Sequence, residues 1–335
     1  MSENPVLVEV LRGQSVESRH RGAFAVVDAT GAIVLSLGEI DKPIFPRSAV
    51  KAFQALPLIE SGAADRFQLT DRELALTISS HSGEPEHVEA AREILAKAGR
   101  DESCLECGSH WPMSRDAERA LAAIGKEPST LHNNCSGKHS GFICLSCGMD
   151  EDTKGYIHPN HVVQREIKAA GESMTEFTFR NDWMGTDGCS IPTYAVPLRN
   201  LAWGFAKLGT GHRLEPKRAV AARRLRKAAA AHPFMVAGTG RLDTAAMEIF
   251  GERLFVKTGA EGVYCAALPE QGFGIAIKAD DGETRAAQAI LAGLVHRFLP
   301  MDDLARQKFD AISLPVLKNW NGIEVGRVRL HDDVI

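Results

Sequence analysis

The sequence predicts an α+β fold in which an antiparallel sheet is flanked by helices. Residues 22–28 and 32–37 have the composition of β-strands, and Asp28-Ala29-Thr30-Gly31 between them has hairpin turn chemistry. A long central region then carries helical patterns, and strand patterns return near the C-terminus. This order, strands, many helices, then strands and helices again, is typical of an α+β sheet with helices packed on it.

The remaining elements follow from hydrophobic periodicity. Residues 6–10 and 273–278 are predicted to be strands, and residues 314–330 are predicted to be extended. Five further segments have helical patterns: 71–78, 86–98, a helix that begins near Phe142, 217–231 and 285–298. The chain has no repeat, low-complexity stretch or obvious linker, so we expect a single domain over residues 1–335.

Composition and charge restrict the class of protein. The 335 residues are 44% hydrophobic and 24% charged, as in a soluble globular protein, and the net charge is −4. A negative net charge offers no surface for nucleic acid or for membranes, and no apolar run is long enough to cross a bilayer. Residues 1–9 lack the pattern of a signal peptide, so we expect a cytoplasmic protein whose seven cysteines are thiols.

The functional argument is centred on residues 45–56. Ser48 precedes Lys51 by three residues at the start of a predicted amphipathic helix, with Pro46 near its entry. Positions three apart share one face of a helix, so Lys51 can reach the Ser48 hydroxyl. Serine needs an adjacent base to act as a nucleophile, and lysine is a base only when burial or a nearby cation lowers its pKa. An isolated pair of this kind is more often a surface serine and lysine.

A second motif, Lys257-Thr258-Gly259, follows an apolar run that is predicted to be a strand ending in a glycine turn. S-x-x-K followed in the chain by K-T-G resembles the serine β-lactamases and penicillin-binding proteins. Those enzymes carry a polar S-x-N element between the two motifs, and this chain has no literal S-D-N. The nearest candidate contains Ser80, and Ser82 stands where the asparagine would be, which disfavours a β-lactam role.

Three stretches together carry a closer resemblance: residues 47–51, 133–141 (Asn-Asn-Cys-Ser-Gly-Lys-His-Ser-Gly) and 187–192. They look like the rhizobial-type (class 3) L-asparaginases, and the similarity covers nearly the whole chain. The resemblance implies a serine-β-lactamase-like fold, a homodimer, a Ser–Lys nucleophile, and L-asparagine as the substrate. It also implies a zinc ion held by two cysteines and a lysine.

The resemblance assigns catalytic roles to two Ser–Lys pairs. Ser48 would attack the side-chain amide of asparagine, and Lys51 would take its proton. Ser80 and Lys257 form the second pair. Lys257 is either a cation that depresses the pKa of Lys51 or a proton shuttle, and the sequence leaves both roles open.

Three further residues are candidates for substrate binding. Arg47 would bind the α-carboxylate bidentately, with a solvent-facing arginine as the equally common alternative. Asp187 would hold the α-ammonium group, with a turn-forming aspartate before glycine as its alternative. His139 is the third candidate, and it is also the conventional alternative metal ligand.

The resemblance also nominates Cys135, Lys138 and Cys189 as zinc ligands. Two thiolates suit zinc, with water or another donor completing the tetrahedron. Lysine is a rare ligand because it must first lose its proton, so the residues alone would not nominate Lys138. Whether the metal is catalytic or only shapes the site stays open.

Two C-x-x-C pairs offer a competing metal site, because this pattern often indicates structural zinc. They are Cys104 with Cys107, and Cys144 with Cys147, and their separation is longer than the usual ribbon spacing. The second pair lies in an apolar segment, where buried thiols are ordinary core residues. Cys265 also lies in an apolar segment and is predicted to belong to the core.

Three other functions share parts of this pattern. A serine-dependent glutaminase would use the same chemistry on a longer substrate, and a β-lactamase-related hydrolase would share the Ser–Lys pair. A zinc-stabilised binding protein on a catalytically inactive fold is the non-enzymatic alternative. Ammonia release from asparagine and glutamine, with nitrocefin hydrolysis as a third assay, discriminates among them.

Overall fold

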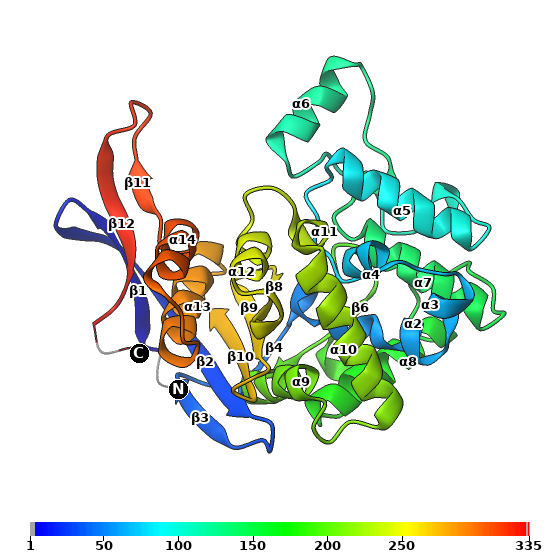
Figure 1. Cartoon of the computed structure of the whole chain (residues 1–335), viewed down its shortest axis with the longest axis horizontal. Helices are drawn as coiled ribbons and strands as arrows, with labels where there is room; N and C mark the ends of the chain where they lie inside the picture. The colour runs from blue at the N-terminus through cyan, green and yellow to red at the C-terminus, as the bar shows by residue number, and fades with distance from the viewer. Residues whose placement is uncertain (1–3, 333, 335) are drawn as a thin grey trace. The chain divides into compact units, whose positions relative to one another are not determined.

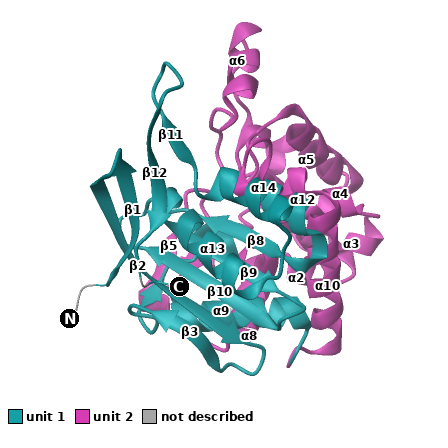
Figure 2. Ribbon diagram, turned by 60° about the vertical axis from the view of Figure 1, so that its left-hand side comes forward, with its two compact units in different colours: residues 1–49, 196–212, 245–335 teal, residues 50–195, 213–244 magenta. Residues whose placement is uncertain are grey.

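The computed structural model of the chain describes residues 4–332 and 334. The chain is organised in two compact units, which Figure 2 colours separately. Unit 1 contains the residues up to Ala49, Val196–His212 and the residues from Ala245 onward. Unit 2 contains Val50–Ala195 and Arg213–Thr244. The single domain expected over residues 1–335 stays a prediction.

Unit 1 is built on an eight-stranded antiparallel sheet with the order β11-β12-β1-β2-β10-β9-β8, in which β3 pairs with β2 off this path. In Figure 1 the red strand β12 lies beside the blue strand β1, so the two ends of the chain share one sheet. The strands are β1 (Val6–Arg12), β2 (Ser15–Asp28), β3 (Ile33–Leu37), β8 (Phe255–Gly259), β9 (Val263–Leu268), β10 (Phe273–Ala279), β11 (Val316–Lys318) and β12 (Glu324–Leu330).

The centre of this sheet is fully buried. β2 pairs with β10 from Gly22 opposite Ala279 to Asp28 opposite Phe273, and all residues of β8 and β9 are buried. Uninterrupted burial is expected when both faces of a strand are covered, and it explains why these segments are apolar runs without alternation. The helices of unit 1 that pack on the sheet are α9 (Leu198–Thr210) and α13 (Thr284–Phe298), and α14 (Asp303–Ser313) packs on α13.

A short two-stranded sheet in unit 1 precedes the candidate nucleophile. It joins β4 (Pro43–Ile44) to β7 (Val196–Pro197), and the 3-10 helix η1 (Arg47–Val50) follows β4 after two residues. The chain then continues directly into α1 (Lys51–Gln54), the first helix of unit 2.

Unit 2 is mainly helical, and α7 (Ser136–Gly148) is packed against α2, α3, α4, α5 and α8. A Cβ added at Gly137 would overlap the carbonyl oxygen of Leu76, so only glycine lets α7 approach α4 this closely. The remaining helices of this unit are α2 (Leu56–Glu60), α3 (Ala63–Arg66), α4 (Asp71–Thr77), α5 (Pro85–Lys97), η2 (Glu102–Cys104), α6 (Arg115–Ala123), η3 (Thr130–His132), α8 (Val162–Thr175), η4 (Asn181–Trp183), α10 (Pro216–Ala231) and α11 (Pro233–Ala237). A hairpin of β5 (Met184–Thr186) and β6 (Pro192–Tyr194) completes it. The chain leaves unit 2 within α12 (Leu242–Phe250), and η5 (Gly251–Arg253) leads to β8.

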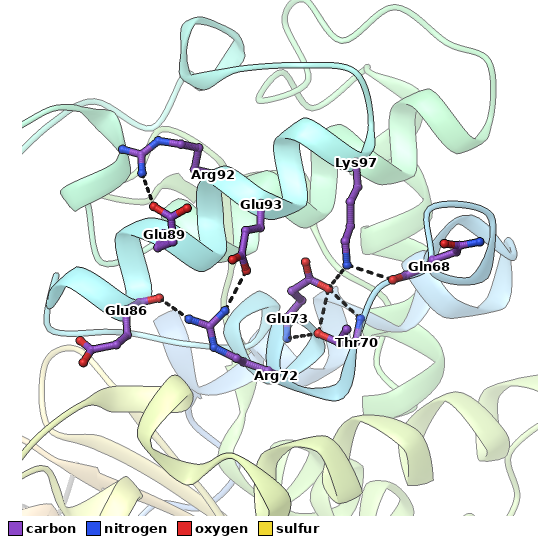
Figure 3. Close-up of polar contacts among 9 residues, drawn as sticks. All are labelled: Gln68, Thr70, Arg72, Glu73, Glu86, Glu89, Arg92, Glu93 and Lys97. Atoms are coloured by element: carbon purple, nitrogen blue, oxygen red, sulfur yellow. Dashed lines mark hydrogen bonds and ion pairs between the residues drawn. The ribbon is translucent and has the colours of Figure 1, made fainter.

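A polar network joins α4 to α5 in unit 2 (Figure 3). The Glu73 carboxylate, which is 2% exposed, accepts hydrogen bonds from the Thr70 backbone N–H and hydroxyl and from Lys97 Nζ at 2.6 Å. Thr70 in turn accepts from the Glu73 backbone N–H, which completes a capping box at the start of α4. One oxygen of the buried carboxylate thus accepts three hydrogen bonds, and the network fixes α4 before it leads to Ser79.

The structure confirms the α+β class with an antiparallel sheet and helices, and it corrects some local boundaries. The predicted amphipathic helix after Pro46 is broken into η1, α1 and α2, because the chain turns again before Pro57. Lys257-Thr258-Gly259 forms the last three residues of β8, and a turn over residues 260–262 follows it, as predicted. The polar residues 17–21 belong to β2, one continuous strand of 14 residues.

Within the described residues, no helix has the length and apolarity required to span a membrane.

Candidate functional site

The candidate nucleophile Ser48 lies in η1, directly after a residue with unusual backbone geometry. Arg47 has φ of +52°, in the left-handed region that few residues other than glycine adopt. Ala49 closes the turn by donating its N–H to the Pro46 carbonyl oxygen at 3.1 Å. Such backbone strain persists only where the surroundings enforce it, and it is concentrated at functional sites.

Unit 1 brings the K-T-G strand next to this turn. A Cβ added at Gly259 would lie 2.6 Å from the Pro46 carbonyl oxygen, so the end of β8 passes directly against the segment that precedes Ser48. Lys257, two residues earlier on β8, is fully buried, and its Nζ donates to the Thr258 carbonyl oxygen at 2.9 Å. The K-T-G strand and the segment that precedes Ser48 are therefore neighbours within this unit.

Lys51 is the best-defined catalytic candidate in unit 2. Its side chain is 1% exposed, and Nζ lies 2.5 Å from the Ser79 carbonyl oxygen, 3.0 Å from Ser80 Oγ and 3.5 Å from the Asn134 carbonyl oxygen. Burial lowers the pKa of Lys51 from its ordinary value, and the charge of Lys138 acts in the same direction against the opposing effect of the nearby thiols. Lys51 is thus biased toward the neutral form that a general base requires.

Ser80 lies in a buried polar loop, residues 79–83, that follows α4. Its backbone N–H donates to the Val236 carbonyl oxygen at 2.9 Å, and Ser82 Oγ donates to the next carbonyl oxygen, that of Ala237, at 2.8 Å. These bonds tie the loop to α11 on one side, while Lys51 contacts the Ser80 hydroxyl. The main chain therefore fixes the direction in which this hydroxyl points.

His81 in the same loop is a scaffold residue. Its Nδ1 accepts from the Gly83 N–H at 3.1 Å, and its Nε2 lies 2.9 Å from Ser136 Oγ. Ser136 Oγ donates to the Leu131 carbonyl oxygen, so it accepts from the His81 Nε2–H. Burial holds the pKa of His81 well below its ordinary value, so the ring is neutral and both of its nitrogens are used.

The Asn-Asn-Cys-Ser-Gly-Lys-His stretch enters α7 through a fixed turn. The Asn133 side chain accepts from the Cys135 N–H at 2.8 Å and donates to the carbonyl oxygens of Cys107 and Gly108. Asn133 therefore connects the residue before α7 to a loop 25 residues earlier in the chain. This single amide explains why a polar residue is required at a position that is 5% exposed.

Cys135, Lys138 and Cys189 come together in unit 2. Lys138 Nζ lies 3.0 Å from Cys189 Sγ, and the thiols of Cys135 and Cys189 are hydrogen-bonded to each other. Cys189 is presented by the turn between β5 and β6, where Ser190 adopts φ of +76°. All three predicted ligands are buried in one cluster, although Cys189 is distant from the other two in the sequence.

The electrostatics of this cluster favour an ion pair. The hydrogen bond from Cys189 lowers the pKa of Cys135 well below its ordinary value and raises the pKa of Cys189. Burial acts to lower the pKa of Lys138, but the facing Cys135 and Cys189 prevail and raise it. The directions of these pKa shifts favour the thiolate form of Cys135 and the ammonium form of Lys138.

Two sulfurs and one amine that converge in this way fit a zinc ion, provided that Lys138 gives up its proton when the metal binds. Of the two ring nitrogens of His139, the alternative ligand, Nδ1 is hydrogen-bonded to Tyr156. The Asp187 carboxylate forms a hydrogen bond within its own turn, where it accepts from the Gly188 N–H at 2.8 Å.

The competing C-x-x-C site is not assembled in the part of the chain that the structure describes, where no three or more His, Cys, Asp or Glu residues gather into a possible metal site. Cys107 Sγ donates to the Thr130 carbonyl oxygen, and Cys144 Sγ donates to the Ile94 carbonyl oxygen. Burial raises the pKa of both thiols to about 12, as expected for core residues. Cys265 is also fully buried, as predicted.

His139 is fully buried on α7, directly after Lys138. Its Nδ1 lies 2.6 Å from the Tyr156 hydroxyl oxygen, and its Nε2 has no hydrogen-bond partner. Burial, with the charges of Lys138 and Lys51, holds the pKa of His139 well below its ordinary value. Sequence reasoning missed Tyr156, and the signal that points to it is a tyrosine inside a polar segment, 153–161, that has little other apolar content.

Comparison with known proteins identifies the class of the chain. The model of the family described as L-asparaginase II matches residues 8–330. The protein therefore belongs to the L-asparaginase II family, and the resemblance found in the sequence motifs is confirmed at this level.

Solved structures with a similar arrangement are distant in sequence. Mglu in its native form is 17% identical with a TM-score of 0.38, and the match covers 84% of this chain and 66% of that one. Mglu in its glutamate form is 18% identical with a TM-score of 0.39, and the match covers 85% of this chain and 63% of that one. The chain thus spans just under two thirds of the length of those Mglu chains. A β-lactamase from Mycobacterium bovis is 14% identical with a TM-score of 0.43, covering 83% of this chain and 95% of that one. No curated protein sequence matches the chain.

Proposed function

We propose that the protein is an L-asparaginase, which hydrolyses the side-chain amide of L-asparagine to L-aspartate and ammonia with Ser48 as the nucleophile. Membership of the L-asparaginase II family supports the amide substrate. The observation that carries the chemistry is the environment of Lys51, a buried lysine of lowered pKa in contact with a serine hydroxyl.

Beside its hydrogen bond with Cys135, Lys51 Nζ has three contacts with oxygen atoms, and these support its role as the base. Two of them are carbonyl oxygens, those of Ser79 and Asn134, which only accept hydrogen bonds. A neutral amine has two N–H bonds and one lone pair. When the two N–H bonds point to the carbonyls, the lone pair faces Ser80 Oγ, which lies 3.0 Å away. Ser80 is therefore the hydroxyl from which a neutral Lys51 accepts a hydrogen bond.

The proposed mechanism gives the two serines different roles. Ser48 Oγ attacks the amide carbon and gives up its proton, which Lys51 Nζ takes, while Ser80 Oγ is the hydroxyl in contact with this base. The tetrahedral intermediate collapses when the proton returns from Lys51 to the departing nitrogen, which leaves as ammonia. Water then attacks the aspartyl ester on Ser48 with Lys51 again as the base, and L-aspartate is released.

Charged residues from the motifs would bind the rest of the substrate. Arg47 is assigned to the α-carboxylate, which its planar guanidinium matches bidentately. Asp187, in the turn that presents Cys189, is assigned to the α-ammonium group. Lys257 stays assigned to the second Ser–Lys pair, as a fixed cation or a shuttle, on the ground of its complete burial.

Cys135, Lys138 and Cys189 would hold a zinc ion, and His139 is assigned to the substrate. Zinc bound there would supply a Lewis acid that polarises an oxygen and fixes the position of groups around it. Formation of the site requires loss of a proton from Lys138 and from Cys189, so zinc affinity will fall in acid. The resemblance also implies a cytoplasmic location and a homodimer. Light scattering on the purified protein tests whether it is a dimer.

The assay that tests the proposal measures ammonia released from L-asparagine and from L-glutamine, with nitrocefin hydrolysis beside them. We expect release from asparagine at the highest kcat/KM. Faster release from glutamine would make the protein a glutaminase, and hydrolysis of nitrocefin alone would make it a β-lactamase-related enzyme. An absence of turnover with all three substrates would contradict an enzymatic role in amide hydrolysis.

A further inference from the structure

The Tyr156 hydroxyl sits between a backbone amide and the ring of His139, in the interior of unit 2. The Glu106 N–H donates to Tyr156 Oη at 2.9 Å, and Oη lies 2.6 Å from His139 Nδ1. The Tyr156 side chain is fully buried, and its main-chain carbonyl oxygen accepts from Gln164 Nε2 at 2.9 Å. Both the hydroxyl and the backbone of this tyrosine are therefore held in place.

The direction of these hydrogen bonds follows from counting protons. A tyrosine hydroxyl has one proton to donate, and its oxygen already accepts from Glu106. If Tyr156 donates to His139 Nδ1, only one polar group is left over, the Nε2–H of the ring. In the reverse arrangement two groups are left over in the interior, the tyrosine proton and the Nε2 lone pair. Each buried polar group without a hydrogen-bond partner is destabilising, so the first arrangement is favoured.

The group left over in the favoured arrangement is a buried donor without an acceptor. His139 Nε2 is among the few buried side-chain polar atoms in the described residues that have no hydrogen-bond partner, and the ring is 0% exposed. The neighbouring residue on α7 is Lys138, which contacts Cys189. The orphan donor therefore belongs to a side chain next to the proposed zinc cluster.

An anionic oxygen is the acceptor that suits this position. His139 lies in the first turns of α7, a helix of 13 residues that starts at Ser136, and the N-terminal end of a helix favours negative charge. A carboxylate oxygen also forms a stronger hydrogen bond than a neutral oxygen does. Among the groups of an amino-acid substrate, a carboxylate is the one that combines both properties.

We propose that Tyr156 is a positioning residue that fixes His139 in its Nε2–H tautomer, so that Nε2–H donates to a carboxylate oxygen of the amino-acid ligand. This deepens the proposed function, because it assigns to the site the recognition of an acidic amino-acid product and of the matching substrate group. Tyr156 does not touch the ligand, and it acts only through the ring of His139. Glu106 donates its backbone N–H to Tyr156, and its carboxylate accepts from the Gly155 N–H at 2.8 Å, which holds the residue before the tyrosine.

The first test is the tautomer itself, measured by nitrogen NMR of the full chain with 15N-labelled histidine. In the wild type we expect a pyridine-like Nδ1 and a pyrrole-like Nε2 for His139, assigned by the disappearance of these signals in His139→Gln. L-Aspartate, used as a stable probe, should shift the Nε2 signal. A pyrrole-like Nδ1 in the wild type would overturn the proposal, whatever the catalytic activity of the protein is.

The second test separates positioning from stability. Tyr156→Phe keeps the ring but removes the donor to Nδ1, and we expect KM for asparagine and Kd for L-aspartate to rise about tenfold while kcat changes less than about threefold. Tyr194→Phe is the matched control, because Tyr194 stacks on Phe179 and its ring is retained. An equal rise of KM in Tyr194→Phe would show that loss of either tyrosine hydroxyl weakens binding, and it would contradict the proposal.

The third test is a double-mutant cycle. In His139→Gln the glutamine amide replaces the Nε2–H donor and has no tautomer to fix, so adding Tyr156→Phe should change KM by less than about twofold. Additive effects of the two substitutions would refute action through His139. The proposed function fails independently, if asparagine is not a substrate, and in that case the NMR result still decides the role of Tyr156.

Discussion

Lys51 Nζ lies 3.0 Å from Ser80 Oγ in the interior of unit 2, so the lysine expected to serve Ser48 is in contact with the serine expected to pair with Lys257. The two Ser–Lys pairs of the sequence are thus not independent. Together with the carbonyl oxygens of Ser79 and Asn134, the Ser80 hydroxyl holds the Lys51 amine in one position.

Replacement of Ser48 tests the nucleophile. Ser48→Ala should lower kcat for asparagine by at least about a thousandfold, because loss of a nucleophile removes the covalent route. The melting temperature should stay close to that of the wild type, since no core volume is lost. Ser61→Ala is the control, a serine at the end of α2 whose hydroxyl bonds only to its own turn. Near-wild-type turnover in Ser48→Ala would remove Ser48 from the mechanism.

The pH dependence of kcat/KM tests the base. Burial lowers the pKa of Lys51 from its ordinary value, and only the neutral amine accepts a proton. Below its pKa the lysine is charged and inactive, so kcat/KM should rise with pH from pH 6 into the alkaline range and be higher at about pH 8–9 than at pH 7. Lys51→Arg, which cannot lose its proton, should be inactive at every pH. A flat profile from pH 5 to pH 9, with zinc occupancy measured as constant, is the result that excludes a titrating lysine.

Elemental analysis tests the metal. We expect one zinc per chain in the wild type, loss of metal in Cys135→Ala and in Cys189→Ala, and retention in Cys104→Ala. Because the facing thiols raise the pKa of Lys138, protons compete strongly with zinc, and metal should be released progressively as the pH falls below neutrality. Full occupancy in Cys135→Ala together with metal loss in Cys104→Ala would favour the C-x-x-C site instead.

The parts of the fold that sequence reasoning found share one property, which is regular local patterning. The hairpin of β2 and β3 and the helices α5, α10 and α13 were predicted within a few residues, because each element repeats its own period. Helix α8 and strand β9 had no prediction, and the helix expected after Pro46 is broken. Its entry depends on the left-handed Arg47, a backbone state that only the tertiary surroundings can enforce.

Only those residues of the site that lie in recognisable sequence motifs could be predicted. Cys135 and Lys138 are close in sequence, but their contact with Cys189 depends on how the β5–β6 turn meets α7, and no local pattern encodes that meeting. Tyr156 was missed because its partners, Glu106 and His139, lie 50 and 17 residues away. The resemblance to a family placed Cys189 in one site with Cys135 and Lys138, which their spacing in the sequence alone does not indicate.

The ion pair between Glu73 on α4 and Lys97 on α5 is predicted to stabilise the fold. Lys97→Met removes a donor from the buried Glu73 carboxylate, and we expect the free energy of unfolding to fall by about 1–2 kcal/mol, because Thr70 still satisfies part of the charge. Arg92→Met is the matched control on the same helix, since its pair with Glu89 is exposed and should contribute less than about 0.5 kcal/mol. Equal losses in the two variants, measured by urea unfolding, would contradict the special role of the buried carboxylate (Figure 3).

The buried histidines of unit 2 predict sensitivity to acid. Burial lowers the pKa of both His81 and His87, so the folded protein keeps these rings neutral where the unfolded chain protonates them near its ordinary value of 6.5. A folded pKa below the unfolded one means that the unfolded state binds more protons in acid. Stability is then fully present above about pH 6.5 and is lost as the pH falls toward the folded pKa values, at up to about 1.4 kcal/mol per pH unit for each ring.

This loss is measured by urea unfolding at pH 7.5 and pH 5.5 in protein treated with a chelator, so that zinc release does not contribute. His81→Gln removes one titrating ring, and its free energy of unfolding should be lower than that of the wild type at pH 7.5 but should fall less between the two pH values. His212→Gln, at an exposed position in unit 1, should keep the wild-type pH dependence. The same slope in His81→Gln as in the wild type would show that the buried ring is protonated in the folded protein, since only then does its titration leave the folding equilibrium unchanged.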